Sequence, residues 1–95
     1  MNLGELDEAL GRELVDELLA VYRTDLATRL TLLRNANDPE QVRRHAHGLR
    51  SGASTFGATA LAEAARTVEC DGGPLDAVER AAAAVDAALA ARLRV

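Results

Sequence analysis

Apolar residues recur every three or four positions across residues 12–36, a long stretch without glycine or proline. This spacing places them on one face of an α-helix and is the strongest helical signal in the sequence. The pattern predicts a long helix over residues 12–36. Its buried face would be formed by Leu14, Leu18, Val21, Tyr22, Leu26, Leu30 and Leu33.

A second helix is predicted to start at a capping signal. Asp38 can accept a hydrogen bond from a free backbone amide, Pro39 suits the first helical position, and Gln41 completes a capping box. We expect this helix to cover residues 39–56, with Gly57 as its left-handed C-cap. The remaining apolar repeats predict shorter helices over residues 3–10, 59–70 and 74–94.

Four main helices joined by short connections favour an antiparallel four-helix bundle, to which residues 3–10 add a short N-terminal helix. A chain of 95 residues is the size of one domain, so residues 1–95 are assigned to a single domain. The composition favours an all-α fold. One Tyr, one Phe and no Trp leave a core of Leu, Val and Ala, which suits closely packed helices better than a sheet.

The net charge and the cysteine content limit the binding partners and cellular locations that the sequence favours. The net charge of -4 argues against nucleic-acid binding, which normally needs a basic surface. With Cys70 as the only cysteine, no internal disulfide can form, and we expect this residue to be half-buried at a helix end. The sequence shows no signal peptide and no apolar window long enough to span a membrane. We therefore expect a cytoplasmic, monomeric domain without membrane contact.

One segment of this acidic chain is purely cationic. Residues 41–62 contain no Asp or Glu, but they include Arg43, Arg44, Arg50 and both histidines of the chain. Such a run is often only a solvated helix face. The positions of these side chains around the helix distinguish a solvated face from a functional one.

A helical wheel separates the two histidines. At about 100° per residue, a core stripe forms from Val42, Ala46, Leu49, Ala53 and Phe56. His47 lies about 140° from the centre of this stripe and points to solvent, whereas His45 lies about 60° to the other side and borders the core. We interpret His45 as a boundary residue hydrogen-bonded at a helix interface. Because residues two apart on a helix point away from each other, the pair cannot chelate one metal ion, and we expect no metal site.

Cationic and hydroxyl side chains occupy the positions that neighbour His47 on the helix surface. These neighbours are Arg43, Arg44, Arg50, Ser51 and Ser54. Nearby cations disfavour an imidazolium, keep a neutral nitrogen available as a nucleophile, and stabilise an anionic group attached to it. The nearest acid on this face is Glu40, two turns away, so no carboxylate is predicted to orient the imidazole and a hydrolytic triad has little support.

Gly48 and Gly52 lie inside the helix that carries His47, and each costs about 1 kcal/mol relative to Ala. Two explanations are compatible with each other. A neighbouring helix could pack closely at these glycines, or a partner protein could need an unobstructed approach to the imidazole.

An exposed imidazole with guanidinium neighbours suits phosphoryl transfer, which depends on positioning and charge stabilisation. The sequence contains no Walker loop, no glycine-rich nucleotide fingerprint and no acidic cluster for magnesium near His47. We therefore expect the chain to carry phosphate without drawing it from ATP. It would then have no kinase activity of its own.

The segment AHGLRSGASTFGA, residues 46–58, resembles the signature of histidine phosphotransfer (HPt) domains. In that family an Ala-His-x-Leu-Lys-Gly run is followed by small residues and then by an apolar residue, Gly and Ala. The resemblance extends weakly over the whole chain. It implies that His47 is a phosphoacceptor in two-component signalling. It would relay a phosphoryl group between a receiver-domain aspartate or a histidine kinase and a response regulator.

The resemblance also implies roles for the neighbours of His47. Arg50 stands where the family usually has Lys and would stabilise the phosphoryl group. From their positions beside His47 on the helix, we expect Arg43 and Ser51 to assist it. Partner docking would involve Arg44, Gly48, Ser51, Gly52 and Ser54. Ser51 replaces the usual Gly, which affects the space beside the imidazole. The chain would need no cofactor, since the Mg²⁺ belongs to the partner receiver domain.

Two other functions are compatible with the sequence. One is the phosphoacceptor region of a histidine kinase, although there the histidine is usually followed by an acid and here by Gly48. The other is a helical adaptor that binds receiver domains independently of phosphate. Outside the histidine segment, Asp25 and Arg29 are spaced to form an ion pair at a helix boundary, and a contact with a partner protein is the alternative.

Overall fold

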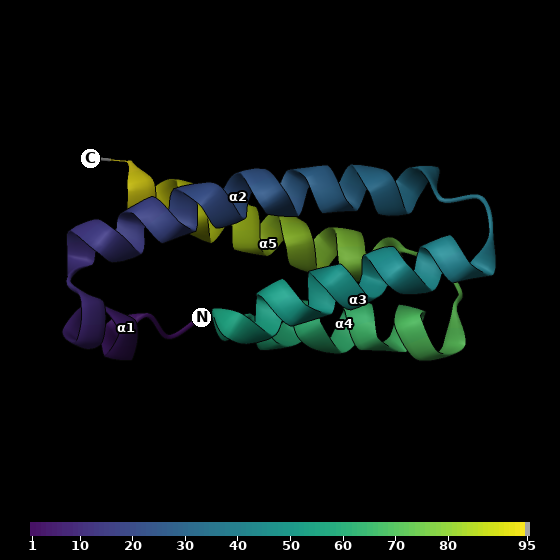
Figure 1. Ribbon diagram of the computed structural model, residues 1–95, viewed down its shortest axis with the longest axis horizontal. Coiled ribbons are helices and arrows are strands. Elements are labelled where there is room, and N and C mark those ends of the chain that lie inside the picture. Colours follow the sequence, from purple (N-terminus) through teal and green to yellow (C-terminus); the bar gives the residue numbers. More distant parts are fainter. Residues whose placement is uncertain (95) are drawn as a thin grey trace.

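Five helices make up the computed structural model, which describes residues 1–94 (Figure 1). In chain order they are α1 (Gly4–Leu10), α2 (Arg12–Asn35), α3 (Pro39–Thr55), α4 (Thr59–Asp71) and α5 (Asp76–Leu93). Helix α2 packs against α3 and α5, and α4 also packs against α3 and α5, while α1 contacts α2. Consecutive long helices run in opposite directions. The predicted antiparallel four-helix bundle with a short N-terminal helix is confirmed, and the helix ends differ from the predicted ones by at most two residues.

Local signals define both ends of α3, the helix that carries the two histidines. Asp38 caps the start, its Oδ1 accepting a hydrogen bond from the Gln41 backbone amide at 2.9 Å. The Gln41 side chain accepts from the amide of Asn37, one residue before the position that a capping box uses. At the other end, Gly57 has a left-handed φ of 71°, and the Ala58 amide donates to the Ala53 carbonyl at 2.8 Å.

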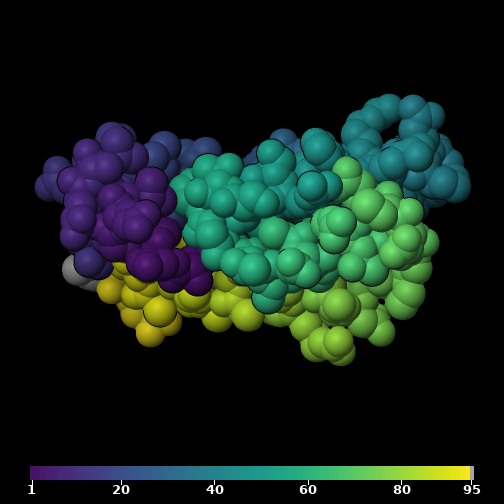
Figure 2. Space-filling view, turned by 90° about the horizontal axis from the view of Figure 1, so that it is seen from below, coloured from purple at the N-terminus to yellow at the C-terminus, as the bar shows by residue number. Residues whose placement is uncertain are grey.

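The core is built from leucine, valine and alanine, as the composition predicts. Helix α3 buries Ala46, Leu49 and Ala53, and half-buries Val42 and Phe56 at the ends of the stripe. Its small residues permit a close approach to α4, and Figure 2 shows α3 and α4 side by side along the middle of one face. The buried residues of α4 and α5 are Leu61, Ala65, Val68, Val78, Ala82, Val85 and Leu89.

The predicted buried face of α2 is wrong in its first half. Leu14, Leu18 and Val21 are 43%, 40% and 69% exposed, whereas Val15 and Leu19 are fully buried. The two apolar stripes lie about 100° apart on the helix, so the pattern alone does not distinguish them.

Packing at the end of α3 explains why the first of these stripes stays exposed. Phe56, just after α3, stacks on Tyr22 with ring centroids 4.6 Å apart, so α3 ends level with the middle of α2. The first turns of α2 project beyond α3 (Figure 1). No α3 residue is therefore available to cover them on that side.

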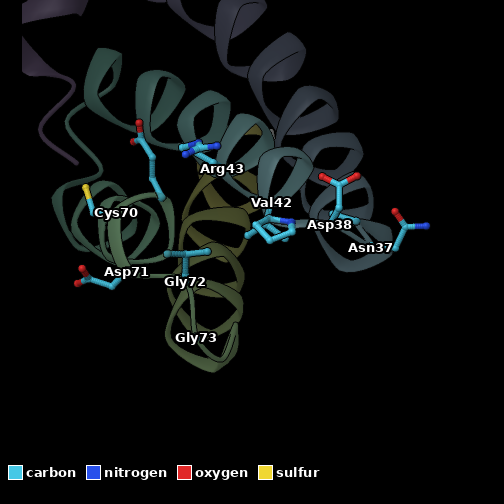
Figure 3. A pocket seen from close by; sticks show the side chains of 12 residues that line it. Asn37, Asp38, Val42, Arg43, Cys70, Asp71, Gly72 and Gly73 are labelled. Carbon is cyan, nitrogen blue, oxygen red and sulfur yellow. The ribbon is translucent and has the colours of Figure 1, made fainter.

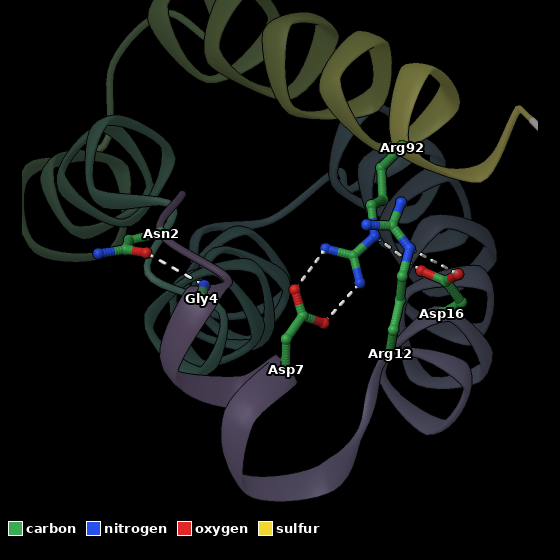
Figure 4. Close-up of polar contacts among 6 residues, drawn as sticks. All are labelled: Asn2, Gly4, Asp7, Arg12, Asp16 and Arg92. Atoms are coloured by element: carbon green, nitrogen blue, oxygen red, sulfur yellow. Dashed lines mark hydrogen bonds and ion pairs between the residues drawn. The ribbon is translucent and has the colours of Figure 1, made fainter.

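Helix α1 has no fully buried residue, but its Leu6 packs partly buried against the core, and an arginine of α5 adds ion pairs to it. Arg92 of α5 donates to both Asp7 oxygens, at 2.6 and 3.1 Å, and to Asp16 of α2 at 2.7 Å (Figure 4). These hydrogen bonds hold the pKa of Asp7 below its usual value and that of Arg92 above it. One guanidinium thus joins α1, α2 and α5.

Cys70 is exposed, so the prediction of a half-buried thiol is wrong. It follows two positions after the buried Val68, which places it about 200° away on the opposite face of α4. Among residues 1–94, no helix has the length and apolar character needed to cross a membrane.

Candidate functional site

His47 lies on the outer face of α3 with 65% of its side chain exposed. His45 is half-buried at the edge of the core. The capping at Asp38 and the buried stripe of α3 together set the rotation of this helix, so the two imidazoles occupy different environments. The helical wheel predicts this separation correctly.

A carboxylate from another helix orients the His47 imidazole. Glu69 of α4 lies with its Oε2 at 2.9 Å from His47 Nδ1, and only 15% of the Glu69 side chain is exposed. The prediction that no carboxylate orients His47 is therefore wrong. Glu69 follows His47 by 22 positions, and only the turn at Gly57 and the packing of α4 on α3 bring the two together.

Glu69 also binds the arginine that the sequence predicts to stabilise phosphate. Arg50 Nη1 donates to Glu69 Oε1 at 2.9 Å, so one carboxylate bridges His47 and Arg50. The hydrogen bond with His47, and next the one from Arg50, hold the pKa of Glu69 below its usual value of 4.5. At neutral pH Glu69 is an acceptor only, so its partner His47 Nδ1 carries a proton, and in the neutral imidazole Nε2 is then the nitrogen with the free lone pair.

A groove between α2 and α3 borders the imidazole on the other side. It has a volume of about 490 Å³, and His47 is part of its wall. The other lining residues are Asp25, Arg29, Arg44, Gly48, Ser51, Gly52 and Thr55. The predicted ion pair between Asp25 and Arg29 is confirmed, with Arg29 Nε at 2.8 Å from Asp25 Oδ2.

The two glycines of α3 face α2. A Cβ atom at Gly48 would overlap the Arg29 Nη1 atom, and one at Gly52 would lie 3.1 Å from Cε1 of Tyr22. Close packing against the buried Tyr22 ring of α2 therefore accounts for Gly52, whereas at Gly48 the neighbour is the end of a flexible arginine side chain. Both glycines also line the groove beside His47, so the absence of side chains clears space there as well.

The structure distributes the other predicted site residues over three places. Arg44, Gly48, Ser51 and Gly52 share the groove with His47. Arg50 and Ser54 line a separate hollow between α3 and α4, together with Arg66. Arg43 lies in a third cavity of about 550 Å³ at the end of the bundle, where Cys70 and Gly72 form part of the wall (Figure 3).

Two functional candidates, Glu69 and Arg29, were not assigned to the site from the sequence. Neither lies on the helix of His47, so no spacing within α3 could indicate them. Gly48 was the one local signal for Arg29, because a glycine inside a helix is one way to make room for a close approach by another element.

The arrangement provides a nucleophile and its immediate electrostatic surroundings. A carboxylate binds one nitrogen of an exposed imidazole, and the other nitrogen is not engaged by that carboxylate. The guanidinium groups of Arg29, Arg44 and Arg50 lie around this site. Residues 1–94 contain no group of three His, Cys, Asp or Glu side chains that could hold a metal ion. This geometry suits nucleophilic attack on an electrophile that a partner presents.

A sequence model described as the Hpt domain matches residues 2–94, nearly the whole chain. No curated protein and no solved structure matches the chain.

Proposed function

This chain belongs to the Hpt domain family, whose members are phosphocarriers in two-component signalling, and on that basis we propose that His47 is its phosphoacceptor. The phosphoryl group would come from a receiver-domain aspartate or a histidine kinase and pass to a response regulator. The chain acts as a carrier in the cytoplasm and does not draw phosphate from ATP itself.

The observation that carries this proposal is the hydrogen bond between His47 Nδ1 and Glu69. It leaves the Nε2 lone pair available to attack the phosphorus of an aspartyl phosphate. The N–P bond forms while the P–O bond to the aspartate breaks, and its electron pair leaves with the aspartate carboxylate. The Nδ1 proton stays in its hydrogen bond with Glu69, where the negative carboxylate offsets the positive charge that develops on the ring.

The return step follows the same path in reverse. The aspartate of the next receiver domain attacks the phosphorus, and the N–P electron pair returns to Nε2. Magnesium would be held by the acidic pocket of the receiver. This chain supplies the imidazole, the carboxylate that orients it and the neighbouring guanidinium groups.

The exposed apolar strip of α2 supports docking of a receiver domain beside His47. Leu14, Leu18 and Val21 share a helix face, and Asp25, four residues after Val21, continues that face into the groove lined by His47. An apolar strip continuous with a reactive group is typical of a protein interface. We expect the receiver to cover this strip with an apolar helix while its aspartyl phosphate meets His47.

The proposal is tested by mixing the purified chain with a phosphorylated receiver domain and Mg²⁺. The chain should gain phosphate that is labile in acid and stable in base, as expected for phosphohistidine. His47→Gln should abolish the gain, and His45→Gln, a matched change two positions away on the same helix, should not.

Two results would contradict the proposal. One is an unaltered chain that gains no phosphate, and the other is His47→Gln gaining as much as the unaltered chain. Binding of the receiver without any transfer would instead indicate an adaptor that works independently of phosphate.

A further inference from the structure

Arg29 reaches from α2 to the surface of α3, where its guanidinium lies beside Gly48, the residue that follows His47. Its guanidinium lies against the Cα of Gly48, where a side chain at position 48 would collide with Nη1. Arg29 and His47 line the same groove. The absence of a side chain at Gly48 therefore gives a cation from another helix access to the residue next to the imidazole.

Asp25 binds this guanidinium through only one of its hydrogen-bond donors. The ion pair is formed by Arg29 Nε and Asp25 Oδ2 at 2.8 Å. An arginine has five N–H donors, so the four on the two Nη atoms are not engaged by Asp25. This forked geometry permits one edge to bind a carboxylate while the other binds a phosphoryl oxygen.

The two nitrogens of His47 face different surroundings. Nδ1 is bound to Glu69, which also holds Arg50. The reactive Nε2 points away from that carboxylate, because the two ring nitrogens of an imidazole diverge. The groove that His47 lines contains Arg29 and Arg44 but not Arg50.

We propose that Arg29 binds the phosphoryl group on His47 through its Nη atoms, and that Gly48 is required because it makes room for this guanidinium. The proposal rests on the proposed phosphoacceptor role of His47. It differs from the sequence-based interpretation, in which Arg50 is the main phosphate ligand. In this arrangement Arg50 keeps Glu69 in place, while Arg29 meets the incoming phosphate.

The test compares Arg29→Gln and Arg29→Lys with Arg34→Gln as a matched control. Arg34 also lies on α2 and also pairs through Nε with a carboxylate, Glu79, at 2.7 Å, but it faces α5. Each protein is phosphorylated with phosphoramidate, a small phosphate donor that needs no receiver domain, and phosphohistidine is followed by ³¹P NMR. Transfer from a phosphorylated receiver is measured in parallel.

Arg29→Gln should slow phosphorylation of His47 about tenfold, because it removes one charge-assisted hydrogen bond to the phosphoryl group in the transition state. Arg29→Lys should recover only part of the rate, because a lysine cannot bind Asp25 and phosphate as a fork. Arg34→Gln should react like the unaltered chain. Equal rates for Arg29→Gln and Arg34→Gln would overturn the proposal and leave the role of His47 intact.

Gly48→Ala gives an independent readout. The added methyl group should displace the Arg29 guanidinium and slow phosphorylation even though alanine favours the helix. Combining Gly48→Ala with Arg29→Gln should cause no further slowing, because both changes remove the same interaction. Additive slowing would contradict the proposal. If His47 of the unaltered chain gains phosphate from neither donor, both the proposal and the proposed function are wrong.

Discussion

Glu69 of α4 holds the Nδ1 atom of His47 of α3 at 2.9 Å, and it does so with a side chain that is mostly buried. A carboxylate that is mostly buried has few alternative positions. The imidazole that it binds is therefore restricted to one tautomer and one range of orientations. The same carboxylate also restrains Arg50. We therefore expect phosphoryl transfer to depend on the contact between these two helices as well as on the sequence around the histidine.

Substitutions of Glu69 should slow phosphoryl transfer to an extent that depends on whether the new side chain can still accept a hydrogen bond from His47 Nδ1. Glu69→Gln keeps an oxygen that can accept from Nδ1 but removes the negative charge, whereas Glu69→Ala removes both. We expect Glu69→Ala to slow phosphorylation of His47 by roughly tenfold or more and Glu69→Gln by less. The rates are measured with a phosphorylated receiver domain. Equal rates in both variants and the unaltered chain would show that the contact has no role in transfer.

The lowered pKa of Glu69 also predicts a pH dependence of stability. Its hydrogen bonds stabilise the folded state fully above the ordinary pKa of 4.5, and this contribution is lost as the pH falls through the lower pKa of the folded protein. Thermal unfolding between pH 7 and pH 3 should therefore show the unaltered chain losing more stability than Glu69→Ala. Glu63→Ala, a change on the same helix, provides the control. A constant difference between Glu69→Ala and the unaltered chain across this range would contradict the assignment.

Tyr22 has a hydroxyl group that is buried without a hydrogen-bond partner in residues 1–94. Burial, with the nearby Asp25 as a second cause, raises its pKa to about 12. Removing an unsatisfied buried hydroxyl should leave the free energy of unfolding unchanged or increase it by about 1 kcal/mol. Tyr22→Phe tests this in urea titrations, because phenylalanine keeps the stacking on Phe56. A loss of more than about 1 kcal/mol would mean that the hydroxyl has a partner after all.

The two glycines of α3 should respond differently to replacement by alanine. At Gly48 the added Cβ meets the end of a flexible arginine, which can move, so Gly48→Ala should stabilise the fold by up to about 1 kcal/mol. At Gly52 it would lie 3.1 Å from the buried Tyr22 ring, which is stacked on Phe56. Gly52→Ala should therefore be neutral or destabilising. Urea unfolding of both variants measures the difference, and a larger gain for Gly52→Ala would show that the Tyr22 ring can shift.

Much of this architecture could be predicted because its signals are local. The start of α3 depends on Asp38 and Pro39, and its end on Gly57, all within hydrogen-bonding reach of the helix itself. The rotation of α3 then follows from its narrow apolar stripe, which predicts that His47 is exposed. The buried face of α2 could not be predicted from the sequence, because this helix carries two apolar stripes. Only the position at which α3 ends selects the stripe that is buried.

The amino-acid sequence by itself determined the helices, the exposed imidazole and the resemblance that leads to the Hpt domain family, because backbone hydrogen bonds, caps and helical periodicity act over a few residues. The tertiary structure alone decided that Glu69 orients His47, that Arg50 is bound to this carboxylate and that Arg29 lies over Gly48. These contacts join residues 19 or more positions apart. Their geometry depends on how far each helix is rotated and shifted against its neighbour, and no spacing within a single helix contains that information.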